Sequence, residues 1–158
     1  MERPREERWR LIGGFLDHTA EAVLITDAKT RIVYVNRSFT RVTGYTLKDV
    51  SGKTPRILHS GRQTAAFYAH MWKCLNASGR WQGEIWNRRK DGSEISIEDS
   101  AAPIRSRDGT IIGAVLVFHD VTERQEARKA LRENEERLRT LINAMPDIVC
   151  FKDGGGRW

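Results

Sequence analysis

Apolar and polar residues alternate over residues 80–90, which predicts a strand that ends in a tight turn at Lys90-Asp91-Gly92. A period of two gives the strand two faces, and one face carries Trp81, Gly83, Ile85 and Asn87. A buried amide needs hydrogen-bond partners, so Asn87 beside apolar residues suits the wall of a pocket for a flat heterocycle. The alternative is a half-buried strand whose Asn87 bonds neighbouring backbone.

The rest of the hydropathy pattern predicts two strands, a block of helices and then three strands. The expected strands lie at 22–27, 31–36, 80–90, 93–104 and 110–120. The expected helices lie at 6–20, 36–44 and 63–75, with short helical turns at 46–61. Turns with an Asp-Gly pair at 90–92 and 107–109 are strong hairpin signals. This order of elements predicts an α+β fold with an antiparallel sheet.

Two expectations concern which side chains face the core. The third expected helix should turn Phe67, Met71 and the pair Cys74-Leu75 inward. Trp86 points opposite to Trp81 on its strand, so we expect it on the outer face, toward the N-terminal helix or a partner subunit.

From Val121 onward the pattern changes to a long charged helix with a heptad seam. The seam positions are Ala127, Leu131, Asn134, Leu138, Leu141 and Met145. A core asparagine fixes the register of a parallel dimer, so Leu131, Asn134 and Leu138 predict a homodimeric coiled coil over 125–140. The alternative is a surface helix packed on its own domain.

The stretch 21–27 has an echo near the end of the chain, at 147–153. Both begin with an acidic residue, continue through an apolar run and end with aspartate. We therefore expect residues 141–158 to begin a second copy of the same domain, cut off at Trp158.

The 158-residue chain carries a formal charge of +6, but its basic residues are dispersed among acidic ones, which argues against nucleic-acid binding. Cys74 and Cys150 form neither a disulfide framework nor a Cys-x-x-Cys pair, which fits a reducing compartment. No apolar run reaches the length of a membrane span, and the N-terminus does not resemble a signal peptide. We therefore expect a cytoplasmic location, with no membrane contact within this chain.

Four stretches, in the same order as in the family, resemble a PAS domain with its C-terminal motif. They are residues 24–27, 35–45, 89–92 and 118–124. The last stretch resembles the junction between a PAS domain and its signalling helix, and it marks Asp120, Thr122 and Arg124 as the signal junction.

The resemblance implies a five-stranded antiparallel sheet with helices over one face that enclose a ligand cavity. It also implies a division into an N-terminal cap helix, a PAS sensor domain, a coiled-coil signalling helix and the start of a second PAS domain. These segments are expected at 1–19, 20–124, 125–140 and 141–158. PAS domains sense a cofactor, a metabolite, light or redox state and pass the signal to an output domain such as a kinase or cyclase.

Within the family, residues 54–61 and 81–92 resemble the FAD-binding redox sensors of nitrogen-fixation and methane-oxidation regulators. In that group the tryptophan matching Trp81 lies beside the flavin, and the strand bearing Asn87 lines the cavity. Arg56 matches a residue near the phosphate. The implied FAD-binding residues are Trp81, Asn87, Arg56, His59, Ile85, Ile97, Phe67 and Met71.

The light-sensing flavin domains of the family are a poorer match. Their photoreactive cysteine corresponds to Pro55, so the resemblance excludes adduct photochemistry. Their second flavin-binding asparagine corresponds to Ile97, which puts an exact transfer of their pocket in doubt.

Haem is the main alternative cofactor, because His70 lies on the helix that often supplies the axial ligand; a surface role for His70 is the other interpretation. The scattered histidines and cysteines lack metal-ligand spacing. No pattern of a nucleophile with its base, or of a phosphate loop, indicates an enzyme.

We therefore expect the sensory input module of a bacterial signal-transduction protein, such as a two-component system. It would sense redox state or oxygen through non-covalently bound FAD and act on an output domain outside this chain. The alternative is a cofactor-free PAS module that works by dimerisation and signal relay.

Overall fold

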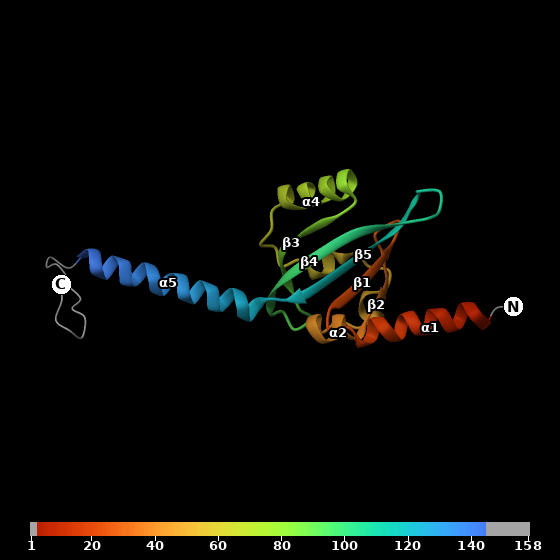
Figure 1. Cartoon of the computed structure of the whole chain (residues 1–158), viewed down its shortest axis with the longest axis horizontal. Coiled ribbons are helices and arrows are strands. Elements are labelled where there is room, and N and C mark those ends of the chain that lie inside the picture. The colour runs from red at the N-terminus through yellow and green to blue at the C-terminus, as the bar shows by residue number, and fades with distance from the viewer. Residues whose placement is uncertain (1–2, 145–158) are drawn as a thin grey trace, which may run out of the picture. The chain divides into compact units, whose positions relative to one another are not determined.

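The structure, a computed structural model, describes residues 3–144 (Figure 1). The chain forms two compact units, Met1–Thr122 and Glu123–Trp158. The first unit contains a sheet of five strands: β1 (Ala22–Asp27), β2 (Ile32–Val35), β3 (Trp81–Arg88), β4 (Glu94–Arg105) and β5 (Ile111–Asp120). Its helices are α1 (Arg3–His18), α2 (Arg37–Thr43), α3 (Leu47–Val50), the short 3-10 helix η1 (Pro55–Leu58) and α4 (Ala65–Ser78). The long helix α5 (Thr122–Ala144) follows β5.

All pairs of neighbouring strands are antiparallel, and the strand order is β2-β1-β5-β4-β3. The predicted α+β fold with its five-stranded antiparallel sheet is therefore confirmed. Each predicted strand is present, with ends that differ from the prediction by no more than two residues. The third predicted helix begins and ends slightly later than expected, because Thr64 caps its first turn and Gly79 ends it in the left-handed conformation.

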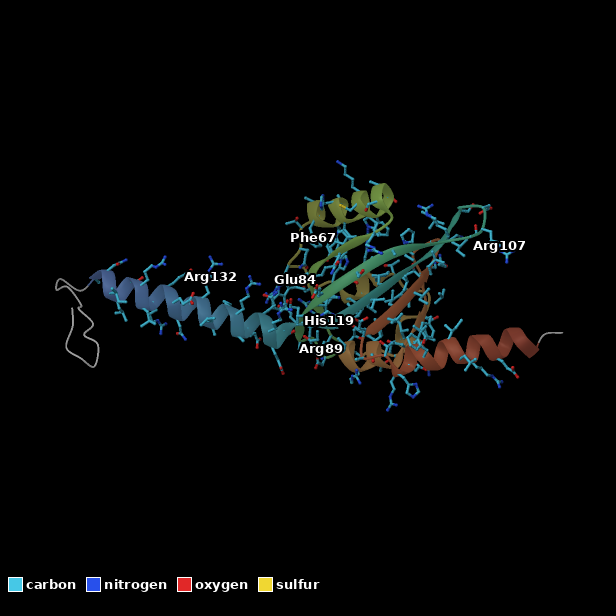
Figure 2. The ribbon with its side chains drawn as sticks, viewed as in Figure 1. Phe67, Glu84, Arg89, Arg107, His119 and Arg132 are labelled. Carbon is cyan, nitrogen blue, oxygen red and sulfur yellow. The ribbon has the colours of Figure 1, made fainter. Side chains whose placement is uncertain are left out.

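Helices cover one face of the sheet, which we call the inner face. From α2, Phe39 meets Phe118 of β5 edge to face, with ring centroids 6.0 Å apart. From α4, Phe67 projects toward the sheet (Figure 2) and meets Trp81 of β3 in the same way, also at 6.0 Å. Both aromatic pairs bury large apolar surfaces between a helix and the sheet. The side chains of Phe67, Met71 and Leu75 contribute to this core, as the helical period predicts.

The alternation on β3 follows the predicted parity. Trp81, Ile85 and Asn87 are buried on the inner face, and Gln82 and Arg88 are exposed on the other. Cross-strand pairing aligns this row with the inner-face residues of β4. The pairs are Trp81 with Ala101, Gly83 with Asp99, Ile85 with Ile97, and Asn87 with Ile95.

The outer position of Trp86 is also confirmed, but its cover comes from an unexpected group. The guanidinium of Arg62 lies 4.0 Å from the centre of the Trp86 ring, and Arg62 also pairs with Glu94. The hydroxyl of Ser60 donates to the carbonyl of Trp86 at 2.7 Å. The segment before α4 therefore covers Trp86, rather than the N-terminal helix, because an arginine can stack on the indole while it stays bonded to a carboxylate.

Asn36 holds three segments together at the start of α2. Its side-chain oxygen accepts hydrogen bonds from the backbone N–H groups of Val23 and Phe39, both at 2.9 Å. Its side-chain nitrogen donates to the carbonyls of Leu16 at 2.7 Å and Glu21 at 2.9 Å. The amide thus caps α2 and joins it to β1 and to the end of α1, while only 1% of the residue is exposed.

The described part of the second unit, residues 123–144, is the part of α5 that follows Thr122. Leu131 and Leu138 are exposed along it, at 62% and 59%. The coiled coil through Leu131, Asn134 and Leu138 stays a prediction. The seam position Met145 and the expected second PAS segment from residue 145 onward lie outside the described residues. Among residues 3–144, no helix combines the length and the apolar character that crossing a membrane requires.

Replacement of the central amide should destabilise the first unit strongly. Asn36→Ala leaves four backbone groups without their partner, so we expect the free energy of unfolding to fall by about 3 kcal/mol. Urea denaturation followed by far-ultraviolet circular dichroism measures this change. The exposed amide of Asn76 on α4 provides the control, because Asn76→Ala should change stability by less than about 0.5 kcal/mol. Equal effects of the two substitutions would contradict the role of Asn36.

Candidate functional site

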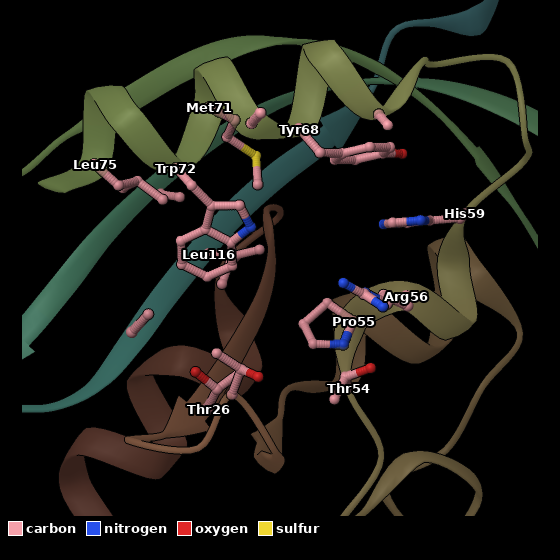
Figure 3. A pocket seen from close by; sticks show the side chains of 15 residues that line it. Thr26, Thr54, Pro55, Arg56, His59, Tyr68, Met71, Trp72, Leu75 and Leu116 are labelled. Atoms are coloured by element: carbon pink, nitrogen blue, oxygen red, sulfur yellow. The ribbon is translucent and has the colours of Figure 1, made fainter.

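A cavity of about 580 Å³ lies between α4, η1 and the inner face of the sheet (Figure 3). This volume is within the range of small-molecule sites, about 300–1,000 Å³. The lining residues are Thr26, Thr30, Thr54, Pro55, Arg56, His59, Ala65, Tyr68, Ala69, Met71, Trp72, Leu75, Ala101, Ala114 and Leu116.

The side of the cavity formed by η1 is polar. Arg56 and His59 approach from η1, and Tyr68 approaches from the facing turn of α4 (Figure 3). The rings of His59 and Tyr68 stack with centroids 4.2 Å apart and planes inclined by 10°. Burial, helped by the nearby Arg56 guanidinium, lowers the pKa of His59, and burial raises the pKa of the Tyr68 phenol. Both rings are therefore neutral at neutral pH, and Arg56 carries the charge.

The remaining walls are apolar. Met71, Trp72 and Leu75 reach into the cavity from α4, and Leu116 faces them from β5 (Figure 3). Among the described lining residues, Arg56 is the single side chain with a formal charge. The cavity therefore suits a ligand with a flat apolar part and an anionic end.

Two hydroxyl groups in the lining lack a partner. Neither Thr26 Oγ1 nor the Tyr68 hydroxyl has a hydrogen-bond partner within the described part of the protein, although both atoms are buried. Buried polar atoms in native proteins are nearly always paired, and a bound molecule is one common source of the partner. Both hydroxyls can donate and accept, so they fit the polar edge of a heterocycle.

The residues predicted for the FAD site fall into two groups. Arg56, His59 and Met71 line the cavity. The other five belong to the packed inner-face layer beside it: Phe67, Trp81, Ile85, Asn87 and Ile97. A backbone bridge between His59 and Asn87 joins the two groups. Their roles toward a cofactor stay predictions.

Trp81 packs tightly on its own strand. A Cβ atom at Gly83 would lie 2.7 Å from Cζ2 of the Trp81 indole, which real contacts do not show. The indole therefore lies flat over Gly83, and only glycine permits this position. In this arrangement the ring fills the space in front of β3 instead of lining the cavity.

Several residues that line the cavity were not in the predicted FAD-binding set, which was drawn mainly from β3 and the family resemblance. Tyr68, Trp72 and Leu75 line the cavity from α4, with Ala65 and Ala69, at spacings of three and four residues. That spacing is itself a helical face, and it could have been found beside the face of Phe67 and Met71. Thr26 and Leu116 come from strands far apart in sequence, so local pattern could not assign them.

His70 does not meet the requirement of the haem hypothesis. It is exposed on α4, and its ring nitrogen lies 3.5 Å from the sulfur of Cys74 on the next turn. An axial ligand must point into the haem cavity, so this position contradicts that role for His70. His59 is the one histidine among the described lining residues. Within residues 3–144, no cluster of three or more His, Cys, Asp or Glu side chains could hold a metal ion.

Asp99 is an acidic residue inside the core. It faces inward from β4, is 4% exposed, and its Oδ1 has no hydrogen-bond partner in the part of the chain described. Burial raises the pKa of its carboxyl group to about 7, although a backbone hydrogen bond from Ser100 acts in the opposite direction. The group is therefore poised to gain or lose a proton near neutral pH.

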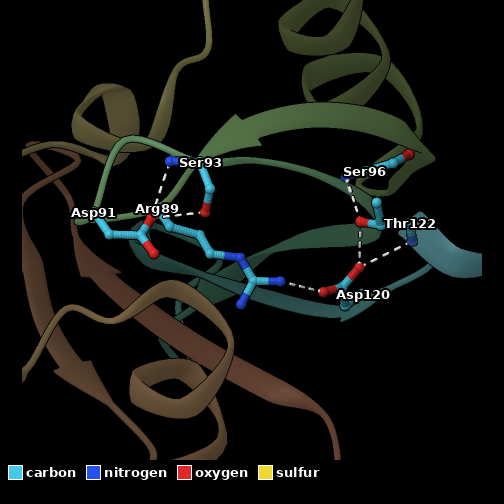
Figure 4. Close-up of polar contacts among 6 residues, drawn as sticks. All are labelled: Arg89, Asp91, Ser93, Ser96, Asp120 and Thr122. Atoms are coloured by element: carbon cyan, nitrogen blue, oxygen red, sulfur yellow. Dashed lines mark hydrogen bonds and ion pairs between the residues drawn. The ribbon is translucent and has the colours of Figure 1, made fainter.

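Two of the three predicted junction residues, Asp120 and Thr122, belong to a hydrogen-bonded cluster at the end of β5 (Figure 4). Asp120 accepts hydrogen bonds from Arg89 at 2.6 Å and from the backbone of Thr122 at 2.9 Å. The Thr122 hydroxyl in turn accepts from the backbone N–H of Ser96 at 3.0 Å. The start of α5 is thus tied to β4 and to the turn between β3 and β4. No contact of Arg124 belongs to this cluster as described.

Comparison with known proteins places these features in a family. The family model of the PAS fold matches residues 12–121. The chain is 26% identical over 138 residues to the nitrogen fixation regulatory protein of Klebsiella oxytoca, which covers 87% of the chain and 28% of that relative. It is 27% identical over 130 residues to the oxygen sensor protein DosP of Escherichia coli, which covers 82% of the chain and 16% of that relative.

A solved light-oxygen-voltage domain, studied with a flavin analogue, has the same fold. Its TM-score is 0.61 with 27% identity, over 78% of this chain and 93% of that domain. The chain spans less than a third of the length of either curated relative.

Asp99 should make the stability of the first unit depend on pH. Between the ordinary pKa of 3.8 and the folded value of about 7, the folded protein holds a proton that the unfolded chain has released. The free energy of unfolding should therefore fall by about 1.4 kcal/mol per pH unit as pH rises through this window. Asp99→Asn should remove this slope and stabilise the protein above pH 7. Urea denaturation across the pH range measures both effects.

The matched control is Glu98→Gln, on the outer face of the same strand, where Glu98 pairs with His119 at 3.4 Å. It should leave the slope in place. A wild-type slope that survives in Asp99→Asn would show that another group holds the proton.

Proposed function

The chain belongs to the PAS family, and from that premise we propose that residues 20–124 are the sensory input module of a bacterial signal-transduction protein. The module senses redox state or oxygen through non-covalently bound FAD. Its output domain lies elsewhere in a longer protein, and the module itself carries no catalytic role.

The chemistry of the cavity is the observation that supports this function most strongly. Apolar side chains of Met71, Trp72 and Leu116 form opposite walls, as a flat isoalloxazine ring requires. The unpaired hydroxyls of Thr26 and Tyr68 offer hydrogen bonds to the polar edge of the ring. The residues present therefore fit a flavin.

Arg56 supplies the complement to the other end of FAD. A guanidinium group binds phosphate oxygens through paired, charge-assisted hydrogen bonds, and FAD carries its negative charge on the pyrophosphate. His59, neutral and stacked on Tyr68, stands between this cation and the apolar walls. Trp81 and Asn87 lie in the packed layer next to the cavity. A change in the position of the Trp81 indole would bring both side chains to the isoalloxazine ring.

The junction provides a route from the site to α5. A bound flavin supplies a ring that exchanges electrons and protons. β4 carries lining residue Ala101 on its inner face and Ser96 at the contact with Thr122. A shift of β4 therefore changes the hydrogen bonds that hold Asp120 and Thr122 at the start of α5. Arg124 on the first turn of that helix carries the change onward.

Substitution at Arg56 tests the orientation of the cofactor. Arg56→Ala should weaken FAD binding by at least roughly tenfold, because the pyrophosphate loses its cation. Binding of riboflavin, which has no phosphate, should change far less. Absorbance and fluorescence titrations of the refolded apoprotein measure both affinities.

Trp81→Ala and Asn87→Ala should impair FAD retention more than they impair folding.

The absorbance spectrum of the wild-type protein shows whether it binds a flavin, haem or no coloured cofactor. Two flavin bands that dithionite bleaches and air restores would support redox sensing. An intense Soret band would replace the proposal with haem. A featureless spectrum that added FAD leaves unchanged would contradict the flavin assignment and favour the second candidate function.

The second candidate is a cofactor-free module that dimerises and relays a signal. It is favoured by apolar side chains that remain exposed within each unit. Leu11 and Phe15 of α1 are 75% and 74% exposed, and Leu131 and Leu138 of α5 are exposed as well. Such residues on a helix commonly mark a contact with another chain.

The seam of α5 predicts how the dimer responds to substitution. Leu131→Ala combined with Leu138→Ala should weaken dimerisation by roughly 100-fold, because both copies lose packed side chains at the seam. Sedimentation velocity over a concentration series measures the dissociation constant. Lys129→Ala with Glu136→Ala, on the opposite side of the same turns, should leave it unchanged. A dimer that tolerates the leucine changes would place the interface outside α5.

A further inference from the structure

Asp99 is a buried acidic side chain for which the proposed FAD site gives no role. Its carboxyl group lies in the middle of β4 on the inner face, and Oδ1 has no hydrogen-bond partner among the described residues. A carboxylate buried in this way costs free energy unless it is paired or protonated. The position is therefore costly for a residue whose task is only to pack.

The surroundings of Asp99 connect it to the ligand face. Its cross-strand neighbours are Gly83 on β3 and Phe118 on β5. The Trp81 indole lies over Gly83, so the ring also covers the Gly83–Asp99 pair. Ala101, the next inward-facing residue on β4, lines the cavity. Asp99 thus stands one residue pair beyond the cavity wall, behind the indole that the FAD site is expected to use.

No ion pair to Asp99 is present among the described residues. The charged side chains of the sheet beside it, Glu84 and Arg88 of β3, Glu94 and Glu98 of β4 and His119 of β5, stand at outer-face positions, and Arg105 at the end of β4 bonds the carbonyl of Gly109. On α4, His70 and Lys73 are exposed, which leaves Tyr68 and Cys74 of α4 and Asp120 at the end of β5. Asp120 is itself paired with Arg89. Gly83, Phe118 and the Phe39 ring of α2 contribute no charge. Arg56, the cation of the cavity lining, is assigned to the pyrophosphate end of FAD, so negative charge that arrives on the ring favours protonation of Asp99.

We propose that Asp99 is the proton-exchanging side chain of this sensor, and that it takes up a proton from solvent when the flavin bound beside it is reduced. The inference rests on the proposed binding of FAD. Beyond FAD binding, it assigns to Asp99 a change of protonation that depends on the charge of the flavin ring. Protonation turns an acceptor-only carboxylate into a group that also donates a hydrogen bond, which changes the contacts of β4.

An external low-potential reductant gives two electrons to the ring, and one proton from water joins the ring, which leaves it with one negative charge. The Asp99 carboxylate gains a second proton from water and forms an O–H bond, so the ring and the carboxyl group together carry one negative charge both before and after reduction. Oxidation by oxygen transfers the two electrons and both protons into hydrogen peroxide, and an acceptor that takes electrons alone leaves both protons in solvent.

Reduction of the holoprotein at different pH values tests the proposal. Dithionite titrations with reference dyes give the midpoint potential of wild type, Asp99→Asn and the control Glu98→Gln. Above about pH 7, the difference between wild type and Asp99→Asn should change tenfold in equilibrium constant per pH unit, about 30 mV for two electrons. Glu98→Gln should follow wild type. In weak buffer with a pH indicator, wild type should take up about one proton more per flavin than Asp99→Asn.

The outcomes separate this inference from the proposed function. A protein that binds no flavin overturns both. Flavin binding with parallel potentials in wild type and Asp99→Asn overturns the role of Asp99 alone. If Asp99→Asn fails to retain flavin, infrared difference spectroscopy of the wild type decides: a carboxylic acid C=O band that appears on reduction supports the proposal, and its absence overturns it.

Discussion

The amide of Asn36 is the point on which the arrangement of the first unit depends. With 1% of its surface exposed, its four hydrogen bonds reach β1, α2, the end of α1 and the loop between α1 and β1. A buried amide is stable only when its donors and acceptors are matched, so these segments can meet in few other ways. Through this constraint α2 is set against the sheet, and Phe39 reaches Phe118.

Against this satisfied interior, the unpaired atoms around the cavity stand out. Thr26 Oγ1 and the Tyr68 hydroxyl face the cavity, and Asp99 Oδ1 lies just beyond it. All four hydrogen bonds of the Asn36 amide are made, whereas these three buried atoms have no partner among the described residues. Their grouping on one face supports the two proposals: a bound molecule gives Thr26 and Tyr68 their partners, and Asp99 exchanges a proton beside it.

β4 links this face to the junction. It carries Asp99 and Ala101 toward the interior, and three positions before Asp99 it carries Ser96, whose backbone groups bond Thr122 and Val121. Arg89, in the turn between β3 and β4, adds the ion pair to Asp120. A strand transmits a displacement along its length more readily than it bends, so the proposed ligand and the start of α5 share one mechanical element.

Local pattern in the sequence was sufficient for the elements and their faces. Alternation placed Trp81, Ile85 and Asn87 inward and Trp86 outward, the Asp-Gly turns placed the hairpins, and Asn36 and Gly44 bounded α2 as cap residues do. The family resemblance then supplied Arg56 and His59. These features are readable because each depends on residues near one another in the chain.

Tertiary structure alone decided what meets at the site. The cavity combines Thr26, Tyr68 and Leu116 from three separate elements, and Trp81 turns onto Gly83 instead of joining them. Arg62 covers Trp86 from a segment more than twenty residues earlier. From the sequence, Asp99 is most simply a surface charge of the sheet, although it shares the parity of Ile95 and Ile97; the structure contradicts the surface position, because Asp99 is buried without a partner for Oδ1 among the described residues. Burial and pairing are properties of the packed whole, which a one-dimensional pattern does not contain.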